Sequence, residues 1–106
     1  MIESQAILLF AALAQETRLK IIRVLVQSGP TGLAAGQLAE RVGVSPSNLS
    51  FHLKELERAG LLNARRQGTS IFYAVSFEML TNLVGFLSQN CCEDAGCQSS
   101  DGACKP

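Results

Sequence analysis

The stretch that decides the fold is residues 44–54, which read VSPSNLSFHLK. Ser45 is a preferred N-cap residue, and Pro46 suits the first helical position, where a backbone N–H would have no intrahelical partner. Apolar residues then recur at helical spacing, and Gly60 ends the pattern. These residues are Leu49, Leu53 and Leu56. We therefore predict a helix from Ser45 to about Ala59 with one buried apolar stripe.

The other face of this predicted helix carries short polar side chains, one aromatic ring and one positive charge. The outward set is Ser47, Asn48, Ser50, Phe51 and Lys54, with Ser45 at the cap. A helix that reads DNA needs one buried stripe and short polar or basic side chains in its first turns. Asn48 can pair with adenine and Phe51 can contact a thymine methyl group, so we predict a recognition helix. His52 lies at the flank of the stripe, where a packing hydrogen bond or a phosphate contact is expected rather than metal ligation.

The residues just before this stretch predict the other half of a helix-turn-helix. Ala35–Val42 has the pattern of a short helix, and Gly43 suits a left-handed C-terminal cap. The inward residues of this helix are Leu38, Ala39 and Val42. A tight turn therefore joins two helices, the second of which is the recognition helix.

The residues that follow the recognition helix indicate a β-hairpin. Leu62–Arg66 and Ser70–Val75 are strand candidates, and residues 67–69 connect them through a glycine. Arg65 and Arg66 stand just before the tip, where they can reach DNA phosphates or the minor groove. The alternative for both arginines is that they are solvated hairpin charges.

The flanks of the chain predict three further helices. The apolar run Ala6–Ala14 belongs to the first, Glu16–Gln27 to the second and Phe77–Gln89 to the last. The second has apolar residues at helical spacing, with two more beside them. These are Leu19, Ile22 and Val26, then Ile21 and Leu25. The first and last helices are more apolar than one core face requires, which indicates a partner for both.

We therefore expect a mainly α fold with a β-hairpin, a winged helix-turn-helix over residues 1–89. Residues 90–106 contain no aromatic or branched apolar residue, so they are expected to form a separate flexible tail. No apolar run is long enough to cross a membrane, and no signal peptide is evident, so the prediction is a cytoplasmic protein without a membrane partner.

Charge is divided along the chain in a way that fits a nucleic-acid partner. The formal net charge is zero, but residues 16–75 hold eight basic and four acidic residues, a net +4 that the flanks balance. The basic part coincides with the predicted DNA-reading elements. The sequence offers no nucleophile and base pair, phosphate-binding glycine loop or paired catalytic acids, so we do not expect an enzyme.

Taken together, the sequence resembles the ArsR/SmtB family of metal-sensing repressors over about residues 8–74. The matching strings are AALAQETRL at 11–19, QLA at 37–39 and VSPSNLSFHLK at 44–54, followed by Leu61, Arg65, Arg66 and Gly68. The resemblance implies a homodimer joined through its first and last helices. It also implies binding to a double-stranded operator with inverted repeats and release of that operator when metal binds.

Two inducer sites known in this family are absent from the sequence. Many arsenic and cadmium sensors carry a Cys-x-Cys site in the helix before the recognition helix, where this chain has Ala34 and Gly36. Other members bind zinc on the last helix, where only Glu78 is a possible ligand between residues 77 and 89. Any metal site must therefore lie elsewhere.

The last sixteen residues hold all four cysteines, Cys91, Cys92, Cys97 and Cys104. In a reducing compartment such a cluster indicates soft-metal binding or redox chemistry rather than structural disulfides. Three thiolates suit trivalent arsenic or antimony, and some arsenite sensors of the family place a cysteine pair and a third cysteine at the end of the last helix. We predict an As(III) or Sb(III) site at Cys91, Cys92 and Cys97, with Cys104 as the alternative third ligand. No organic cofactor is expected.

Three other interpretations of the tail stay open. It can be a thiol switch in which the same cysteines form a disulfide on oxidation. It can belong to an arsenic carrier or thiol reductase, although that function leaves the helix-turn-helix unexplained. It can also be inert.

Overall fold

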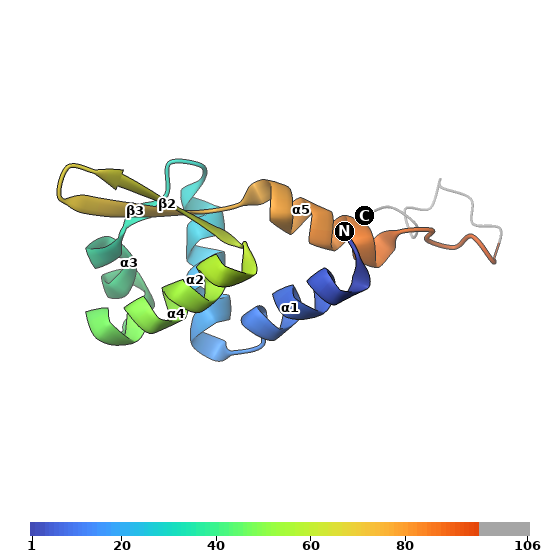
Figure 1. Ribbon diagram of the computed structural model, residues 1–106, viewed down its shortest axis with the longest axis horizontal. Helices are drawn as coiled ribbons and strands as arrows, with labels where there is room; N and C mark the ends of the chain where they lie inside the picture. Colours follow the sequence, from blue (N-terminus) through green and yellow to red (C-terminus); the bar gives the residue numbers. More distant parts are fainter. Residues whose placement is uncertain (96–106) are drawn as a thin grey trace.

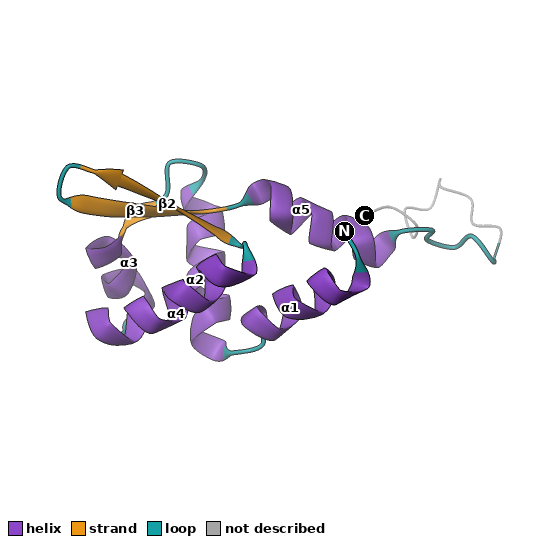
Figure 2. Cartoon of the chain, in the orientation of Figure 1, coloured by secondary structure: helices purple, strands orange, loops and turns teal. Residues whose placement is uncertain are grey.

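The computed structural model describes residues 1–95, which form five helices and three strands (Figure 1). In chain order these are α1 Glu3–Leu13, α2 Glu16–Ser28, β1 Leu33–Ala34, α3 Ala35–Val42, α4 Pro46–Ala59, β2 Leu62–Gln67, β3 Ser70–Val75 and α5 Phe77–Ser88. Figure 2 shows α2, α3 and α4 gathered beside the sheet, while α1 and α5 extend away from the hairpin. The fold is a winged helix-turn-helix, as predicted.

The hairpin is the longest pairing of the sheet. β2 and β3 pair without interruption to Gln67 opposite Ser70, which leaves a two-residue tip. Gly68 in that tip has a φ of +65°, in the left-handed region that glycine enters without strain. The strand prediction was therefore correct to within one residue, since β2 ends at Gln67 rather than Arg66.

The strand β1 lies between the predicted helices Glu16–Gln27 and Ala35–Val42, where the sequence pattern predicts no strand. Leu33 and Ala34 pair antiparallel with Tyr73 and Phe72, so β3 lies between β1 and β2. Gly32 allows this approach, because a Cβ at that position would overlap the carbonyl oxygen of Tyr73. Two residues show no alternating pattern, so this strand is defined by its long-range pairing alone.

One hydrophobic core joins the helices to the base of the hairpin. Its fully buried large side chains are Leu9, Ile21, Leu25, Leu38, Leu49, Leu56 and Leu61. The predicted inward stripes of α3 and α4 are confirmed, because every residue assigned to them is buried. The helix-turn-helix therefore rests on this shared core.

The helix α2 presents a different face to the core from the one its spacing first suggested. Ile21, Ile22 and Leu25 are buried, whereas Leu19 is 49% and Val26 is 39% exposed. The apolar residues of α2 cover more than one helical face, so the helical period alone permits two stripes. Packing against the rest of the core selects one of them.

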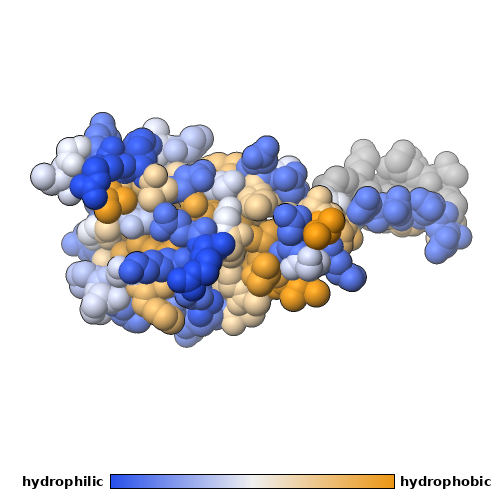
Figure 3. All heavy atoms as spheres, viewed as in Figure 1, coloured by the Kyte–Doolittle hydropathy of each residue, from blue (hydrophilic) through white to orange (hydrophobic). Residues whose placement is uncertain are grey.

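The helices α1 and α5 lie beside one another and leave much of their apolar surface in solvent. α1 buries Ala6, Leu9 and Ala12, and α5 buries Leu83. Their exposed apolar residues are Ile7, Leu8, Phe10, Val84 and Leu87. Figure 3 shows an apolar patch at this end of the molecule and hydrophilic side chains over the hairpin. Within residues 1–95, no helix is long and apolar enough to cross a membrane.

Candidate DNA-binding surface and cysteine segment

The turn between α3 and α4 has the geometry that the sequence predicted. Gly43 adopts the left-handed conformation, with φ +83° and ψ +36°, and its N–H donates to the carbonyl of Ala39 at 2.8 Å. Ser45 caps α4, because its Oγ accepts a 3.2 Å hydrogen bond from the backbone N–H of Asn48. Short-range hydrogen bonds therefore set the direction in which the recognition helix leaves the turn.

The polar face of α4 is open to solvent. Six predicted DNA-contacting residues are exposed: Ser45, Ser47, Asn48, Ser50, Phe51 and Lys54. Leu49, Leu53 and Leu56 lie on the opposite face in the core, so burial and exposure divide the helix lengthwise. The N-terminal end of α4 and the hairpin both lie at the end of the molecule away from the N-terminus of the chain (Figure 1). The recognition helix and the hairpin can therefore face one DNA duplex together.

His52 is inside the protein, which corrects its place among the predicted DNA contacts. Its side chain is 7% exposed, and its Nδ1 accepts a 3.2 Å hydrogen bond from Nε of Arg18. Burial lowers the pKa of His52, the positive charge of Arg18 lowers it further, and Glu55 acts in the opposite direction. The packing hydrogen bond that the sequence offered as one alternative is the one present.

The two hairpin arginines are both exposed, but their surroundings differ. Arg65 lies over the ring of Phe72, with Cζ 5.2 Å from the ring centroid, and one of its Nη atoms donates to the carbonyl of Thr31 at 3.5 Å. Within residues 1–95, Arg66 makes no contact of this kind, and it lies one residue nearer the tip. Arg65 is therefore held against the sheet by two contacts that Arg66 does not make.

The cysteine pair follows α5 directly. The N–H of Cys91 donates to the carbonyl of Ser88 at 3.0 Å, and the Sγ atoms of Cys91 and Cys92 are 3.5 Å apart. Both residues are half-buried. Cys97 and Cys104 lie outside the described residues, and within residues 1–95 no three His, Cys, Asp or Glu side chains gather as a metal site. The described part thus contains two of the predicted ligands side by side.

A tight helix turn with an exposed polar second helix, followed by a basic hairpin, defines a winged-helix DNA-binding domain. A family model described as a helix-turn-helix domain matches residues 13–65. The transcriptional activator HlyU of Vibrio cholerae is 33% identical over 90 residues, which cover 85% of this chain and 81% of HlyU. The arsenical resistance operon repressor of Bacillus subtilis is 37% identical over 83 residues, 78% of this chain and 74% of the repressor. The chain belongs to the ArsR/SmtB family.

Solved structures agree with this assignment. Reduced HlyU from Vibrio cholerae N16961 has a TM-score of 0.66 at 32% identity, covering 90% of this chain and 92% of HlyU. The homodimeric winged helix-turn-helix domain of Mb0332 from Mycobacterium bovis, a possible ArsR-family regulator, has a TM-score of 0.66 at 28% identity and covers 90% and 88%. The protein is therefore a DNA-binding transcriptional regulator and not an enzyme. The arsenic carrier or thiol reductase considered from the sequence does not fit this family.

Proposed function

We propose that the protein is a homodimeric repressor that releases its operator when trivalent arsenic or antimony binds Cys91, Cys92 and Cys97. Cys104 is the alternative third ligand. The observation that carries this proposal is the pair of sulfurs 3.5 Å apart immediately after α5. One ion can bond both of them, because metal–thiolate bonds are about 2.3 Å long.

The proposed DNA contacts follow from the exposed face of α4. These side chains are exposed. In the proposed complex Asn48 pairs with adenine and Phe51 contacts a thymine methyl group, while the serines and Lys54 bind bases and phosphates. Arg66 extends from the hairpin toward the backbone of the same duplex. Two copies related by a two-fold axis would place their recognition helices about one helical turn apart, which matches an operator with inverted repeats.

The proposed dimer covers the exposed apolar residues of α1 and α5. Leu8 is 65% and Leu87 is 63% exposed. The helix α1 buries three residues, of which two are alanines, and α5 buries one. Exposed apolar side chains gathered on two neighbouring helices are costly in water and are typical of a protein interface. The homodimeric Mb0332 domain supports the same assembly for this chain.

The proposed release begins at the end of α5. Thiophilic ions favour thiolate ligands, and a pyramidal three-sulfur site suits the lone pair of As(III) or Sb(III). Binding would gather the chain after Cys92 onto the last turn of α5, which belongs to the proposed dimer interface. A changed interface alters the spacing of the two recognition helices, and an affinity loss of tenfold needs only about 1.4 kcal/mol. The arsenical resistance repressor of Bacillus subtilis supports arsenic as the inducer.

The test measures operator release by arsenite, using a labelled fragment of the gene's own promoter and a phosphine reductant that keeps the thiols reduced. The variant Cys91→Ser/Cys92→Ser should bind DNA as the wild type does and should no longer respond to arsenite. Cys97→Ser should lose the response as well, and Cys104→Ser is the matched control that keeps it. Reversal of the last two results would assign Cys104 as the third ligand. Normal release by the double variant would refute the site.

A thiol switch is the second candidate, favoured by the half-buried cysteine pair and by the relation to HlyU, which has been solved in a reduced form. In this mechanism peroxide oxidises the tail cysteines to a disulfide, and water is the reduced product. Release of the operator by peroxide without any metalloid, reversed by reductant, would select it. Release by arsenite under full reduction would select the metalloid mechanism.

A further inference from the structure

Arg18, at the start of α2, connects α1, one of the two proposed dimerisation helices, with the recognition helix α4. One of its Nη atoms donates to the carbonyl of Ala12 at the end of α1, at 3.4 Å. Its Nε donates to Nδ1 of His52 on α4, at 3.2 Å. Its own backbone N–H is held at 2.9 Å by the side chain of Gln15, which caps α2. The guanidinium is thus bonded on both sides and fixed at its base.

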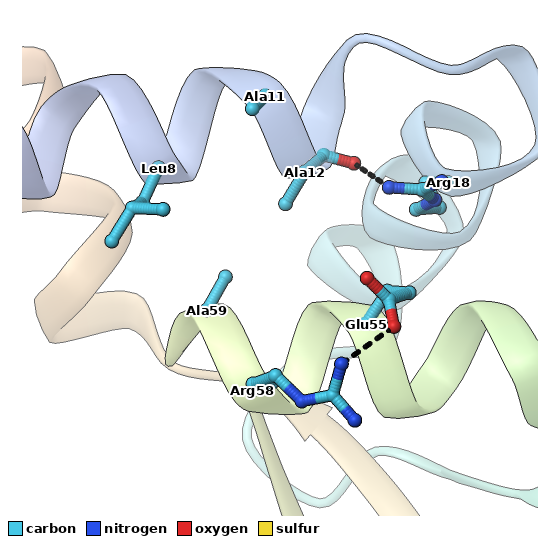
Figure 4. Close-up of a pocket in the computed structure, with 7 residues that line it drawn as sticks. All are labelled: Leu8, Ala11, Ala12, Arg18, Glu55, Arg58 and Ala59. Carbon is cyan, nitrogen blue, oxygen red and sulfur yellow. Dashed lines mark hydrogen bonds and ion pairs between the residues drawn. The ribbon is translucent and has the colours of Figure 1, made fainter.

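The space around Arg18 makes this connection specific. A pocket of about 360 Å³ separates this part of α1 from α4 (Figure 4). Ala11, Ala12 and Ala59 line it, and their short side chains leave the gap between the helices open. Figure 4 shows Arg18 at one end of the pocket, with its bond to Ala12, and the Arg58–Glu55 ion pair of α4 at another part of the wall. Arg18 therefore supplies a polar bridge where apolar packing is sparse.

His52 links this bridge to the DNA-facing side of α4. Because its Nδ1 accepts the bond from Arg18, the ring is neutral and carries its proton on Nε2. The ring is also in edge-to-face contact with the ring of Phe51, with centroids 5.3 Å apart. Phe51 is 58% exposed on the recognition face. The chain of contacts therefore runs from the end of α1 through Arg18 and His52 to a proposed DNA contact.

We infer that Arg18 is a positioning residue that carries a shift of α1 at the dimer interface to the recognition helix through His52. This inference rests on the proposed function, because the shift begins where α1 and α5 meet a second copy. In the operator-binding form, the two hydrogen bonds of Arg18 fix the orientation of α4 about its own axis. Inducer binding at the end of α5 moves α1. This movement displaces Arg18 and, through it, His52. The helix α4 then rotates, and its exposed face no longer lies in position to contact the bases.

The experiment is a double-mutant cycle on the full chain, read out by operator affinity with and without arsenite. Arg18→Met keeps the length of the side chain and removes the donors, while His52→Phe keeps a ring and removes the acceptor. Each variant should weaken operator binding about tenfold, and the double variant should be no weaker than either, because both break one bridge. The ratio of affinities without and with arsenite should fall toward one. His52→Gln, which can still accept from Arg18, should retain most of the affinity.

Arg58→Met is the matched control, because it removes a positive charge from the wall of the same pocket without touching His52. It should change operator affinity much less than Arg18→Met at equal salt. Thermal unfolding and sedimentation check that each variant is a folded dimer. Where Arg18→Met does not fold, the contrast between His52→Phe and His52→Gln decides the question.

Additive losses in the double variant, or normal affinity and normal arsenite response in a folded Arg18→Met dimer, would overturn the inference. Failure of arsenite to release the wild type is a separate result, because it refutes the proposed inducer alone. The double-mutant cycle measures the coupling between Arg18 and His52 in operator affinity without any inducer. It therefore tests the positioning role independently of arsenite.

Discussion

The helices α4 and α1 both contribute buried residues to the core, but they complete their packing in different ways. α4 buries its leucines and presents polar side chains to solvent, so it is complete within one chain. α1 is the more apolar of the two, but it buries only two alanines and Leu9 and leaves Ile7, Leu8 and Phe10 exposed. The comparison teaches that the DNA-reading unit is built to meet water or DNA, whereas the terminal helices are built to meet another apolar surface.

The sharpest test of the self-contained reading unit compares two neighbouring positions of α4. Leu53→Ala removes a side chain that is 3% exposed and should lower the free energy of unfolding by about 2–5 kcal/mol. Phe51→Ala removes one that is 58% exposed and should cost about 1 kcal/mol or less while weakening operator binding. Chemical denaturation of both variants measures the difference. Equal losses of stability would contradict the division of α4 into two faces.

A charge on the exposed surface of the terminal helices should have the opposite effect, because it should prevent dimerisation and leave the fold stable. Leu87→Glu should leave the monomer folded, prevent dimerisation and weaken operator binding by about 100-fold, equivalent to about 2.7 kcal/mol. Sedimentation and fluorescence anisotropy measure the two effects. Gln27→Glu, exposed near the end of α2, adds the same charge as a control and should leave the dimer intact. A Leu87→Glu protein that still sediments as a dimer would place the interface elsewhere.

A smaller effect separates the two arginines of the hairpin. Arg66→Ala should reduce the slope of log affinity against log salt by about 1, as expected for one lost phosphate contact. Arg65→Ala should change that slope less and should lower stability slightly, because Arg65 packs over Phe72. Operator titrations at several salt concentrations provide the slopes. A larger slope change for Arg65 would reverse the assignment.

The smallest expected effect is a pH dependence that comes from His52. Burial, with help from the charge of Arg18, holds the pKa of His52 below its ordinary value of about 6.5. As the pH falls through that value the unfolded chain takes up a proton that the folded protein resists. The stabilising contribution is therefore complete above about pH 6.5 and declines as the pH falls toward the lowered folded pKa.

Denaturation of the wild type and of His52→Gln at pH 7.5 and pH 5.5 measures this contribution. The wild type should lose more stability on acidification than the variant, which has no ionisable group at position 52. The same loss in both proteins would show that other groups account for the pH dependence.

Much of the reading unit could be predicted because its signals are local. The cap at Ser45, the left-handed Gly43 and the leucine spacing of α4 each involve residues within a few positions of one another. Helix limits and the buried stripe therefore agree with the structure. The hairpin was also predictable, since its glycine lies at the tip between two strand-like segments.

The features that the sequence did not predict depend on contacts between residues far apart in the chain. β1 exists only because Leu33 and Ala34 reach β3, which lies about forty residues away in the sequence. The buried face of α2 was selected by the helices packed against it rather than by its own period. His52 stands at the edge of a stripe, where spacing does not distinguish a buried side chain from an exposed one. Its partner is thirty-four residues away.

The sequence by itself determined the helix-turn-helix, the wing and the excess of apolar surface on the first and last helices, because capping, turn geometry and periodicity act over short distances. Only the tertiary structure decided that His52 faces Arg18 rather than DNA, and that Arg65 is held while Arg66 is more open. It also showed that the Sγ atoms of Cys91 and Cys92 lie 3.5 Å apart directly after α5. These features depend on which surfaces meet, and that is settled by the packing of the whole domain.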